Sequence, residues 1–551
     1  MNTPRLELVW PGKEKFLLLP KDDAGKPVWV ERDHPAASEV RLADFVGSVG
    51  EVPEVPYAAN LLFTGDSLDV LRILCEVPEY RAIYRGKVKL VYIDPPFNTG
   101  QAFEHYDDWM EHSTWLSFMR ERLLLIRDLL SPDGSVWVHL DDAEQHRMRL
   151  LMDEVFGPAN FVTTVIWEKA DSPRNSARQF SSDHDYVLVY SRDGNWSPNR
   201  LPRTADSDSI YTNPDDDPRG PWLPGDPYAN KPYSKGLYEK TGPTGRVFTP
   251  PPGRFWRISE EKLDALDSEG RVWWGPTGNA RPSIKRYLSE VADLVPRTIW
   301  SKEDVGSNRT SKNEMRAIFA GVSSFATPKP ERFMERVLRI ATQQGDAVID
   351  CFAGSGTTAA VAHKMGRRWV TVELSPSTVE QFTLPRLTKV VAGEDPGGIT
   401  KSVGWEGGGG FRTVTVGPSM YEDTTFGILL AGWATNGRFA RAVAGQLGFE
   451  FQKEAAPLCG VRGRMRLAVV DGAVGPEEVR LIVGALGEKE RVTIVAKSVL
   501  PEAESTLTDI SPGSRIRKAP RDLLTSGARR MRRRTEASPR HTSNETEGSG
   551  S

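Results

Sequence analysis

The end of one apolar run, residues 87–93, carries four consecutive residues that could do chemistry: Asp94, Pro95, Pro96 and Phe97. The run itself is predicted to be a buried strand. The prolines lack N–H groups and fix φ, so a rigid strand cap is enough to explain them. A cap explains neither an acid that closes an apolar strand nor an aromatic ring that follows a solvent-facing turn. The tetrapeptide therefore indicates a functional site.

The reaction that suits these groups acts on an exocyclic amino group of a nucleobase. The lone pair of such a nitrogen is delocalised into the ring, which makes the nitrogen a poor nucleophile. The carboxylate of Asp94 and the carbonyl of Pro95 would each accept one N–H and favour a pyramidal, more reactive nitrogen. Phe97 would stack on a base turned out of the helix. These residues predict direct in-line methyl transfer from a sulfonium donor.

A glycine turn at residues 350–360 follows a second apolar run and opens a predicted helix. Gly354 and Gly356 would let the backbone approach a ligand closely, while the helix N-terminus offers free N–H groups. Glu373 ends the next predicted strand, where an acid can bind ribose hydroxyls. With Ala359, the glycines also satisfy the dinucleotide fingerprint. A nicotinamide or flavin enzyme, or a turn needed only for packing, therefore remains an alternative.

The elements that must position these residues alternate between strand and helix, which predicts an α/β fold with a doubly wound, mostly parallel sheet. Strands are expected at residues 60–66, 87–93, 135–140, 185–190, 347–350, 368–374, 465–472 and 491–497. Helices are expected at residues 67–74, 113–130, 142–156, 329–342 and 359–366. Ser113 is the expected N-cap of its helix, and residues 131–134 are the turn that ends it.

The chain is expected to divide into six segments, because its composition changes along its length. These are an N-terminal arm (1–55), a catalytic half (56–199), a target-recognition insert (200–322), a cofactor-binding half (323–404), a smaller C-terminal α/β domain (405–525) and a disordered tail (526–551). The insert mixes basic and aromatic residues without a clear period, as functional elaborations do. Its candidate DNA contacts are Lys235, Lys240, Arg254, Lys285 and Arg286, although any single one is more often ordinary surface.

The two motifs together, "DPPF" and "FAGSGTT", resemble those of the amino-methylating DNA methyltransferases that use S-adenosyl-L-methionine. The catalytic motif precedes the cofactor motif, with the insert between them, as in the beta group of these enzymes. Longer stretches, among them "LLFTGDSLDVL" and "FATPKPERFMERVL", are similar to the modification (Mod) subunits of type III restriction systems. The resemblance covers roughly residues 45–525 and implies a Rossmann-like methyltransferase fold with permuted motif order. One departure is phenylalanine in the catalytic motif, where tyrosine is common.

The resemblance implies roles for individual residues. Asp94, Pro95, Pro96 and Phe97 become the catalytic turn. The donor pocket is assigned to Asp350, Phe352, Gly354, Gly356 and Thr357, with Glu373 on the ribose and Lys329 at an edge beside Pro330. Asp66 is similar to a family acid near the base or the donor. Two local alternatives stay open: Asp66 as the N-cap of the following helix, and Lys329–Pro330 as a basic turn before a helix.

The activity that the resemblance implies is site-specific methylation of adenine N6 in double-stranded DNA, since an Asp in the motif is usual for adenine enzymes. Cytosine N4 methylation, a solitary methyltransferase and a non-catalytic DNA-binding specificity subunit are the alternatives. A 5-methylcytosine enzyme is excluded by family pattern, because no cysteine follows a proline. A homodimer is expected from the family. No G-x-x-x-x-G-K-[ST] phosphate loop occurs, so an ATPase-nuclease restriction subunit would be a separate chain.

The composition of the 551 residues places few limits on function. The formal net charge of −3 means that a DNA-binding surface must be a local basic face. Three cysteines far apart suit a reducing compartment, and no Cys/His spacing predicts a metal site. No run approaches the roughly 20 apolar residues of a membrane helix. A cytoplasmic protein without membrane contact is expected.

Overall fold

The structure is a computed structural model, and it describes residues 7–18, 27–98, 102–103, 106–107, 110–173, 177–232, 234–319, 325 and 327–524. The segment predicted to be a disordered tail, 526–551, lies outside these residues. None of the described helices combines the length and the apolar character that a membrane crossing requires.

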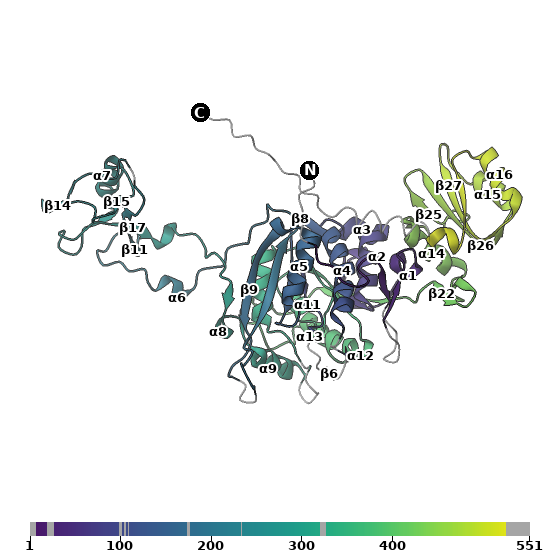
Figure 1. Cartoon of the computed structure of the whole chain (residues 1–551), viewed down its shortest axis with the longest axis horizontal. Coiled ribbons are helices and arrows are strands. Elements are labelled where there is room, and N and C mark those ends of the chain that lie inside the picture. Colours follow the sequence, from purple (N-terminus) through teal and green to yellow (C-terminus); the bar gives the residue numbers. More distant parts are fainter. Residues whose placement is uncertain are drawn as a thin grey trace. The chain divides into compact units, whose positions relative to one another are not determined.

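The largest sheet of the described residues has ten strands, and Figure 1 labels two of them, β8 and β9. In spatial order its strands are β18 (Ile299–Trp300), β9 (Phe161–Glu168), β10 (His184–Ser191), β8 (Leu130–Leu140), β5 (Val88–Ile93), β19 (Ala347–Asp350), β20 (Arg368–Glu373), β4 (Asn60–Thr64), β21 (Gly410–Val416) and β3 (Ala43–Gly50). All except β10 and β3 run in one direction. The predicted mostly parallel sheet is confirmed.

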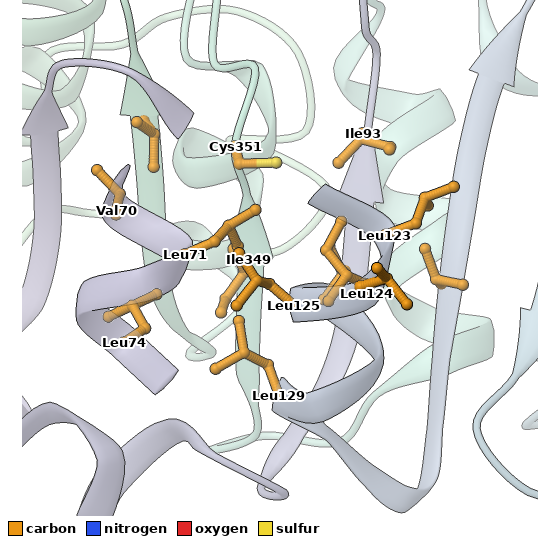
Figure 2. Packing of buried hydrophobic residues seen from close by; sticks show 14 of the residues in the cluster. Val70, Leu71, Leu74, Ile93, Leu123, Leu124, Leu125, Leu129, Ile349 and Cys351 are labelled. Carbon is orange, nitrogen blue, oxygen red and sulfur yellow. The ribbon is translucent and has the colours of Figure 1, made fainter. Parts of the chain in front are cut away.

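One face of the sheet is covered by α2 (Ser67–Glu76), α4 (His112–Leu129) and α5 (Gln145–Phe156). Figure 2 shows apolar side chains of α2 and α4 turned toward the strands. Leu71 and Leu125 belong to one hydrophobic cluster with Ile93 of β5 and Ile349 of β19, and these four side chains are almost completely buried. Burial of this kind stabilises a fold by roughly 1.5–3 kcal/mol for each large apolar side chain.

The opposite face carries α10 (Glu331–Ala341), which packs on α11 (Thr357–Lys364), which in turn packs on α13 (Leu384–Ala392). Phe333 of α10 is fully buried, with its ring 5.0 Å from Trp167 and 5.4 Å from Trp300. Helices therefore cover both faces, as the doubly wound arrangement predicts.

Further short elements surround this sheet. They are β1 (Phe16–Leu18), β2 (Val28–Val30), α1 (Pro35–Ser38), a 3₁₀ turn (Pro56–Ala58), α3 (Pro78–Tyr84), β6 (Ala102–Phe103), β7 (Tyr106–Asp107), a 3₁₀ turn (Pro158–Asn160), α8 (Lys302–Val305), α9 (Asn308–Ile318), α12 (Pro376–Thr378) and a π-helical segment (Val379–Thr383).

Local predictions around α4 differ from the structure at both helix ends. The helix begins at His112, so Ser113 lies in its first turn and the N-cap is Glu111, whose carboxylate accepts from the N–H of Ser113 (2.8 Å). The expected turn at 131–134 belongs to β8, which starts where α4 ends. The pairing of β5 with β8 jumps there from Val88–Leu130 to Leu90–Ser135, so these four residues form an irregularity in the ladder. A local turn signal cannot reveal such a bulge.

The chain separates into two compact units, residues 1–198 with 297–551, and residues 199–296. The second unit contains α6 (Ala205–Asp208), β11 (Trp222–Gly225), β12 (Tyr228–Ala229), β13 (Lys240–Thr241), β14 (Val247–Phe248), β15 (Phe255–Trp256), α7 (Glu260–Ser268), β16 (Val272–Trp273), β17 (Ser283–Tyr287) and a 3₁₀ turn (Leu288–Glu290). Near its two ends, Leu201 and Leu294 exchange a pair of backbone hydrogen bonds, each 2.8 Å. The insert thus begins and ends at one paired position.

The C-terminal part of the first unit has a five-stranded sheet, in the order β24 (Glu450–Phe451), β25 (Gly460–Arg462), β26 (Met465–Val474), β27 (Arg491–Val499) and β28 (Arg515–Lys518). Three helices accompany it, α14 (Asn436–Leu447), α15 (Pro476–Gly484) and α16 (Pro501–Ile510). A hairpin of β22 (Tyr421–Thr424) and β23 (Gly427–Leu430) precedes it. The smaller C-terminal α/β layer agrees with the predicted fold class.

The segment boundaries differ in three places from those expected. The compact insert ends at Pro296 rather than at residue 322, because β18 pairs with β9 and Trp300 is buried in the central core. The expected N-terminal arm, 1–55, contributes β3 to the central sheet, and the expected C-terminal domain, 405–525, contributes β21. Strand pairing between distant segments decides these boundaries, and such pairing cannot be predicted from composition.

Candidate active site

A pocket lies where the carboxyl ends of β4, β5, β19 and β20 meet, as expected for the edge of a parallel sheet. Nine residues predicted from the sequence line it: Asp66, Asp94, Pro96, Lys329, Asp350, Phe352, Gly354, Thr357 and Glu373. Pro95, Phe97 and Gly356 are not among the lining residues, but they belong to the same two turns as residues that are. The fold therefore brings the catalytic and donor motifs together although 235 residues separate Asp94 from Lys329.

The two carboxylate oxygens of Asp94 have different environments. Its Oδ2 forms an ion pair with the ammonium group of Lys329. Its Oδ1 is buried and accepts no hydrogen bond from any residue that the structure describes. A buried acceptor without a donor is costly, so this oxygen is suited to receive an N–H from a ligand.

The turn after Asp94 is held on both sides. The indole Nε1 of Trp115 donates to the carbonyl of Pro96 (2.8 Å), which leaves the Pro95 carbonyl as the predicted second acceptor of the turn. Asn98 adopts a left-handed conformation, with φ of 60°. Its Nδ2 donates to Oε1 of the fully buried Glu144 (2.7 Å). Such support fixes the acceptors before a ligand arrives.

The ring of Phe97 lies against a buried histidine. It stacks on His139 with centroids 5.9 Å apart and planes 15° apart, and the Lys329 ammonium is 5.4 Å from the Phe97 centroid. His139 contacts the hydroxyl of Tyr92 (2.9 Å) and the carboxylate of Asp185 (3.2 Å). Burial lowers the pKa of His139, which keeps the imidazole neutral at physiological pH. Stacking of Phe97 on a base stays a prediction.

The glycine loop is shaped by two left-handed residues and one carboxylate. Gly354 has φ of 50° and Gly356 has φ of 77°, and a β-carbon at either would approach a neighbouring side chain within 3.1 Å. Glu373 at the end of β20 accepts from the N–H of Gly354 (2.9 Å) and of Ser375 (3.0 Å). The loop is therefore fixed by the same acid that we predict to contact a ribose.

Asp350 lines the pocket. It ends β19, is almost completely buried and accepts from the N–H of Phe352 (3.0 Å). Burial raises the pKa of Asp350 to about 7, and the nearby charges of Asp94 and Glu373 add to the increase. An acid poised near neutrality in a pocket is typical of a functional site.

Asp66 was open to two interpretations, and the structure confirms one of them. It is the N-cap of α2, since its Oδ1 accepts from the N–H of Leu68 (2.7 Å), and it also lines the pocket. Arg122 donates to both of its carboxylate oxygens (2.9 and 3.0 Å). The capping role is confirmed, and a contact with a base or donor stays a prediction.

Lys329 lines the pocket beside both motifs, and its predicted place at the edge of the donor pocket stays a prediction. Its ammonium pairs with Asp94 of the catalytic turn, and its backbone carbonyl accepts a hydrogen bond from the hydroxyl of Thr357 in the glycine turn (3.4 Å). Pro330 stands at the N-cap position of α10, so the Pro-led helix start is also correct. One residue thus joins the two motifs.

Several supporting residues have no sequence signal of their own. Arg386 donates to Thr357 Oγ1 (2.8 Å) and to Glu331 (2.9 Å), and Lys364 connects Glu331 (2.7 Å) with Asp395 (2.6 Å). Each of these ion-paired side chains is at most 1% exposed. Breaking one such pair typically costs about 3–5 kcal/mol, so the network makes the base of the glycine turn rigid.

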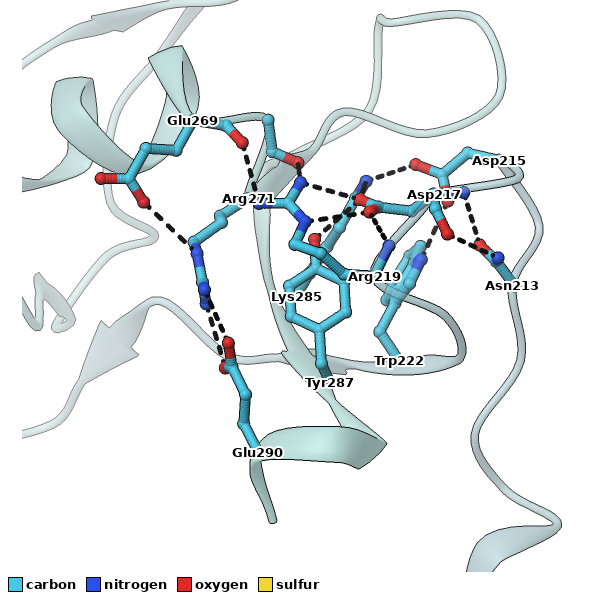
Figure 3. A network of polar contacts seen from close by, with 11 residues as sticks. Asn213, Asp215, Asp217, Arg219, Trp222, Glu269, Arg271, Lys285, Tyr287 and Glu290 are labelled. Atoms are coloured by element: carbon cyan, nitrogen blue, oxygen red, sulfur yellow. Dashed lines mark hydrogen bonds and ion pairs between the residues drawn. The ribbon is translucent and has the colours of Figure 1, made fainter.

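Three of the five candidate DNA contacts in the insert form ion pairs within it, and Figure 3 shows one of them, Lys285. Lys285 is buried and pairs with both Asp215 and Asp217, Lys240 pairs with Asp264, and Arg254 pairs with Asp226. The hydrogen bonds of Arg219, followed by those of Lys285 and Tyr287, hold the pKa of Asp217 well below its usual range. Lys235 and Arg286 point into solvent, so they are the remaining candidates of the predicted set.

Comparison with known proteins identifies relatives of the chain. A family model described as DNA methylase matches residues 88–384. The type III restriction-modification enzyme StyLTI Mod subunit of Salmonella typhimurium is 32% identical over 54% of this chain and 49% of its own length. The type II methyltransferase M.EcaI of Enterobacter cloacae is 28% identical, over 67% of this chain and 75% of its own length. The chain therefore spans about half the length of the Salmonella relative.

Among solved structures, the cytosine-N4-specific PvuII DNA methyltransferase is similar over 63% of this chain and 90% of its own. Its sequence identity is 16% and its TM-score is 0.35.

Proposed function

The chain belongs to the DNA methylase family, and from this premise we propose that it methylates N6 of an adenine flipped out of double-stranded DNA. The methyl donor is S-adenosyl-L-methionine, which supplies an electrophilic methyl group on a sulfonium. The relatives named as Mod subunits support a role as the modification subunit of a type III-like restriction-modification system. A homodimer, a separate ATPase-nuclease subunit and a cytoplasmic location belong to the same proposal.

The observation that carries the proposal is the buried Oδ1 of Asp94, which no described residue hydrogen-bonds, in a pocket shared with the glycine loop. An adenine amino group has two N–H bonds. One would be donated to Asp94 Oδ1 and the other to the Pro95 carbonyl, which concentrates the lone pair on the nitrogen. The prolines and Trp115 hold these acceptors in place, so little reorganisation is needed when the nitrogen attacks.

The donor side of the pocket has groups that suit S-adenosyl-L-methionine. Gly354 leaves open backbone where a side chain would stand, and Glu373 offers a carboxylate at the end of β20 for ribose hydroxyls. Phe118 and Phe352, with ring centroids 6.1 Å apart, give the pocket an apolar wall. These residues would bind and orient the donor, and Asp94 would orient the acceptor.

Long-read sequencing of DNA from methylation-free bacteria that express the protein tests the function. We expect N6-methyladenine at one sequence motif with the wild type and none with an Asp94→Ala variant. N4-methylcytosine would instead establish the cytosine alternative. Absence of both modifications, with folded protein present, would contradict the proposal.

Replacement of Lys329 by methionine distinguishes a role in orienting Asp94 from a role in binding S-adenosyl-L-methionine. Loss of the ammonium removes the partner of Asp94 Oδ2, so we expect kcat to fall about 10- to 100-fold, which is the usual worth of a hydrogen bond to a charged group. The dissociation constant for S-adenosyl-L-methionine, measured by calorimetry, should change less than about threefold. Lys312→Met, at an exposed position of α9, is the matched control. A large loss of affinity for S-adenosyl-L-methionine with unchanged kcat would instead show that Lys329 binds the methyl donor.

A further inference from the structure

The segment between β9 and β10 exposes an aromatic side chain at the catalytic edge of the sheet. Strand β9 runs parallel to β18 and antiparallel to β10, and β10 is antiparallel to β8, which is parallel to β5. The carboxyl ends of β9 and β5 therefore lie at the same edge as Asp94. Phe180, in the connection from β9 to β10, is 95% exposed at this edge.

The base of this connection is anchored to the catalytic turn. Lys169 pairs with Asp185 (2.5 Å), and the N–H groups of Lys169 and Ala170 donate to the carbonyl of Asp183 (2.8 and 3.3 Å). The other carboxylate oxygen of Asp185 contacts His139, on which Phe97 stacks. Two side chains thus link the base of the connection to the residue predicted to stack on the flipped base.

The neighbours of Phe180 suit a nucleic acid rather than a protein core. Arg178 and Gln179 precede it in the chain and are also exposed. A guanidinium group can contact a phosphate, and an amide can contact base edges. Proteins that distort DNA commonly insert an apolar side chain between bases, while a flipped nucleotide leaves a gap in the stack that needs filling.

We propose that Phe180 enters the duplex and occupies the space left by the flipped adenine, an inference that rests on the proposed function. The side chain would not touch the reacting atoms. It would lower the free energy of the flipped state by replacing the lost stacking. The target it implies is paired double-stranded DNA, since a base that is already unstacked needs no such help.

The test uses two duplex oligonucleotides that carry the sequence motif identified by long-read sequencing. In one the target adenine is paired with thymine, and in the other it lies opposite an abasic site. For Phe180→Ala we expect kcat/KM to fall about 10- to 100-fold on the paired duplex and less than about threefold on the abasic one. Phe180→Leu keeps an apolar wedge and should recover most of the loss. A 2-aminopurine at the target position should show correspondingly weaker fluorescence with Phe180→Ala.

The matched control is Phe426→Ala, because Phe426 is 91% exposed but lies in the turn between β22 and β23. Its activity should equal that of the wild type on both duplexes. An equal loss for Phe180→Ala on both duplexes would overturn the wedge and indicate general DNA binding, and unchanged activity on the paired duplex would overturn it too. A wild type that methylates neither duplex would overturn the proposed function and, with it, the wedge.

Discussion

Asp94→Ala is expected to reduce the rate of methyl transfer by at least about 10³-fold, the upper range for loss of one preorganised polar contact to a reacting group. The carboxylate is a charged acceptor for the amino group, and its buried Oδ1 receives no hydrogen bond from the part of the chain that the structure describes. Donor binding should persist, because the glycine loop and Glu373 remain intact. Single-turnover methylation and calorimetric titration with S-adenosyl-L-methionine measure the two quantities separately.

The Asp94→Ala change also leaves the Lys329 ammonium without its partner, so folding must be controlled. Asp94→Asn keeps the shape of the side chain, and the double variant Asp94→Ala/Lys329→Met keeps the pocket free of an unpaired charge. Both should melt near the wild-type temperature and remain inactive. Methylation close to the wild-type rate in any of the three variants would remove Asp94 from the reaction.

Gly354→Val is expected to weaken binding of S-adenosyl-L-methionine about 10- to 100-fold. The residue has φ of 50°, and its new β-carbon would lie 3.1 Å from the ring of Phe325, another residue of the pocket. A branched side chain in this conformation costs of order 1–3 kcal/mol, and the loop must move to relieve it. Calorimetric titration with the donor gives the dissociation constant directly.

A second glycine provides the control for Gly354→Val. Gly345 has φ of 83°, and no atom of the described residues lies within 4 Å of where its β-carbon would stand; it is in the turn before β19. Gly345→Val should therefore carry similar backbone strain and lower the melting temperature without changing donor affinity. Equal donor affinities in the two variants would show that the loop containing Gly354 does not bind the donor.

Local sequence signals identified the elements around both motifs because those signals are themselves local. The apolar run before Asp94 forms β5, and the glycine turn connects β19 to α11, as the pattern predicts. Each of these signals lies within a few consecutive residues: one is a strand that ends at a polar residue, and the other is a glycine-rich helix start.

Contacts between distant segments cannot be predicted from local sequence patterns. Nothing near Asp94 indicates that Lys329 will pair with it or that Trp115 will fix the Pro96 carbonyl. Lys285 looks like a surface cation in a basic stretch, yet acids 68 and 70 residues away neutralise it. Pairing energies of this kind depend on tertiary placement, which a single sequence does not encode in any short pattern.

The pair formed by Leu201 and Leu294 has an evolutionary implication. Because the chain enters and leaves the 199–296 unit through one doubly bonded position, two recombination crossovers flanking that position exchange the whole unit. Both halves of the pocket, including Asp94 and the glycine loop, would be inherited unaltered. Related chains can therefore exchange the 199–296 unit as one cassette while the chemistry of the pocket is retained.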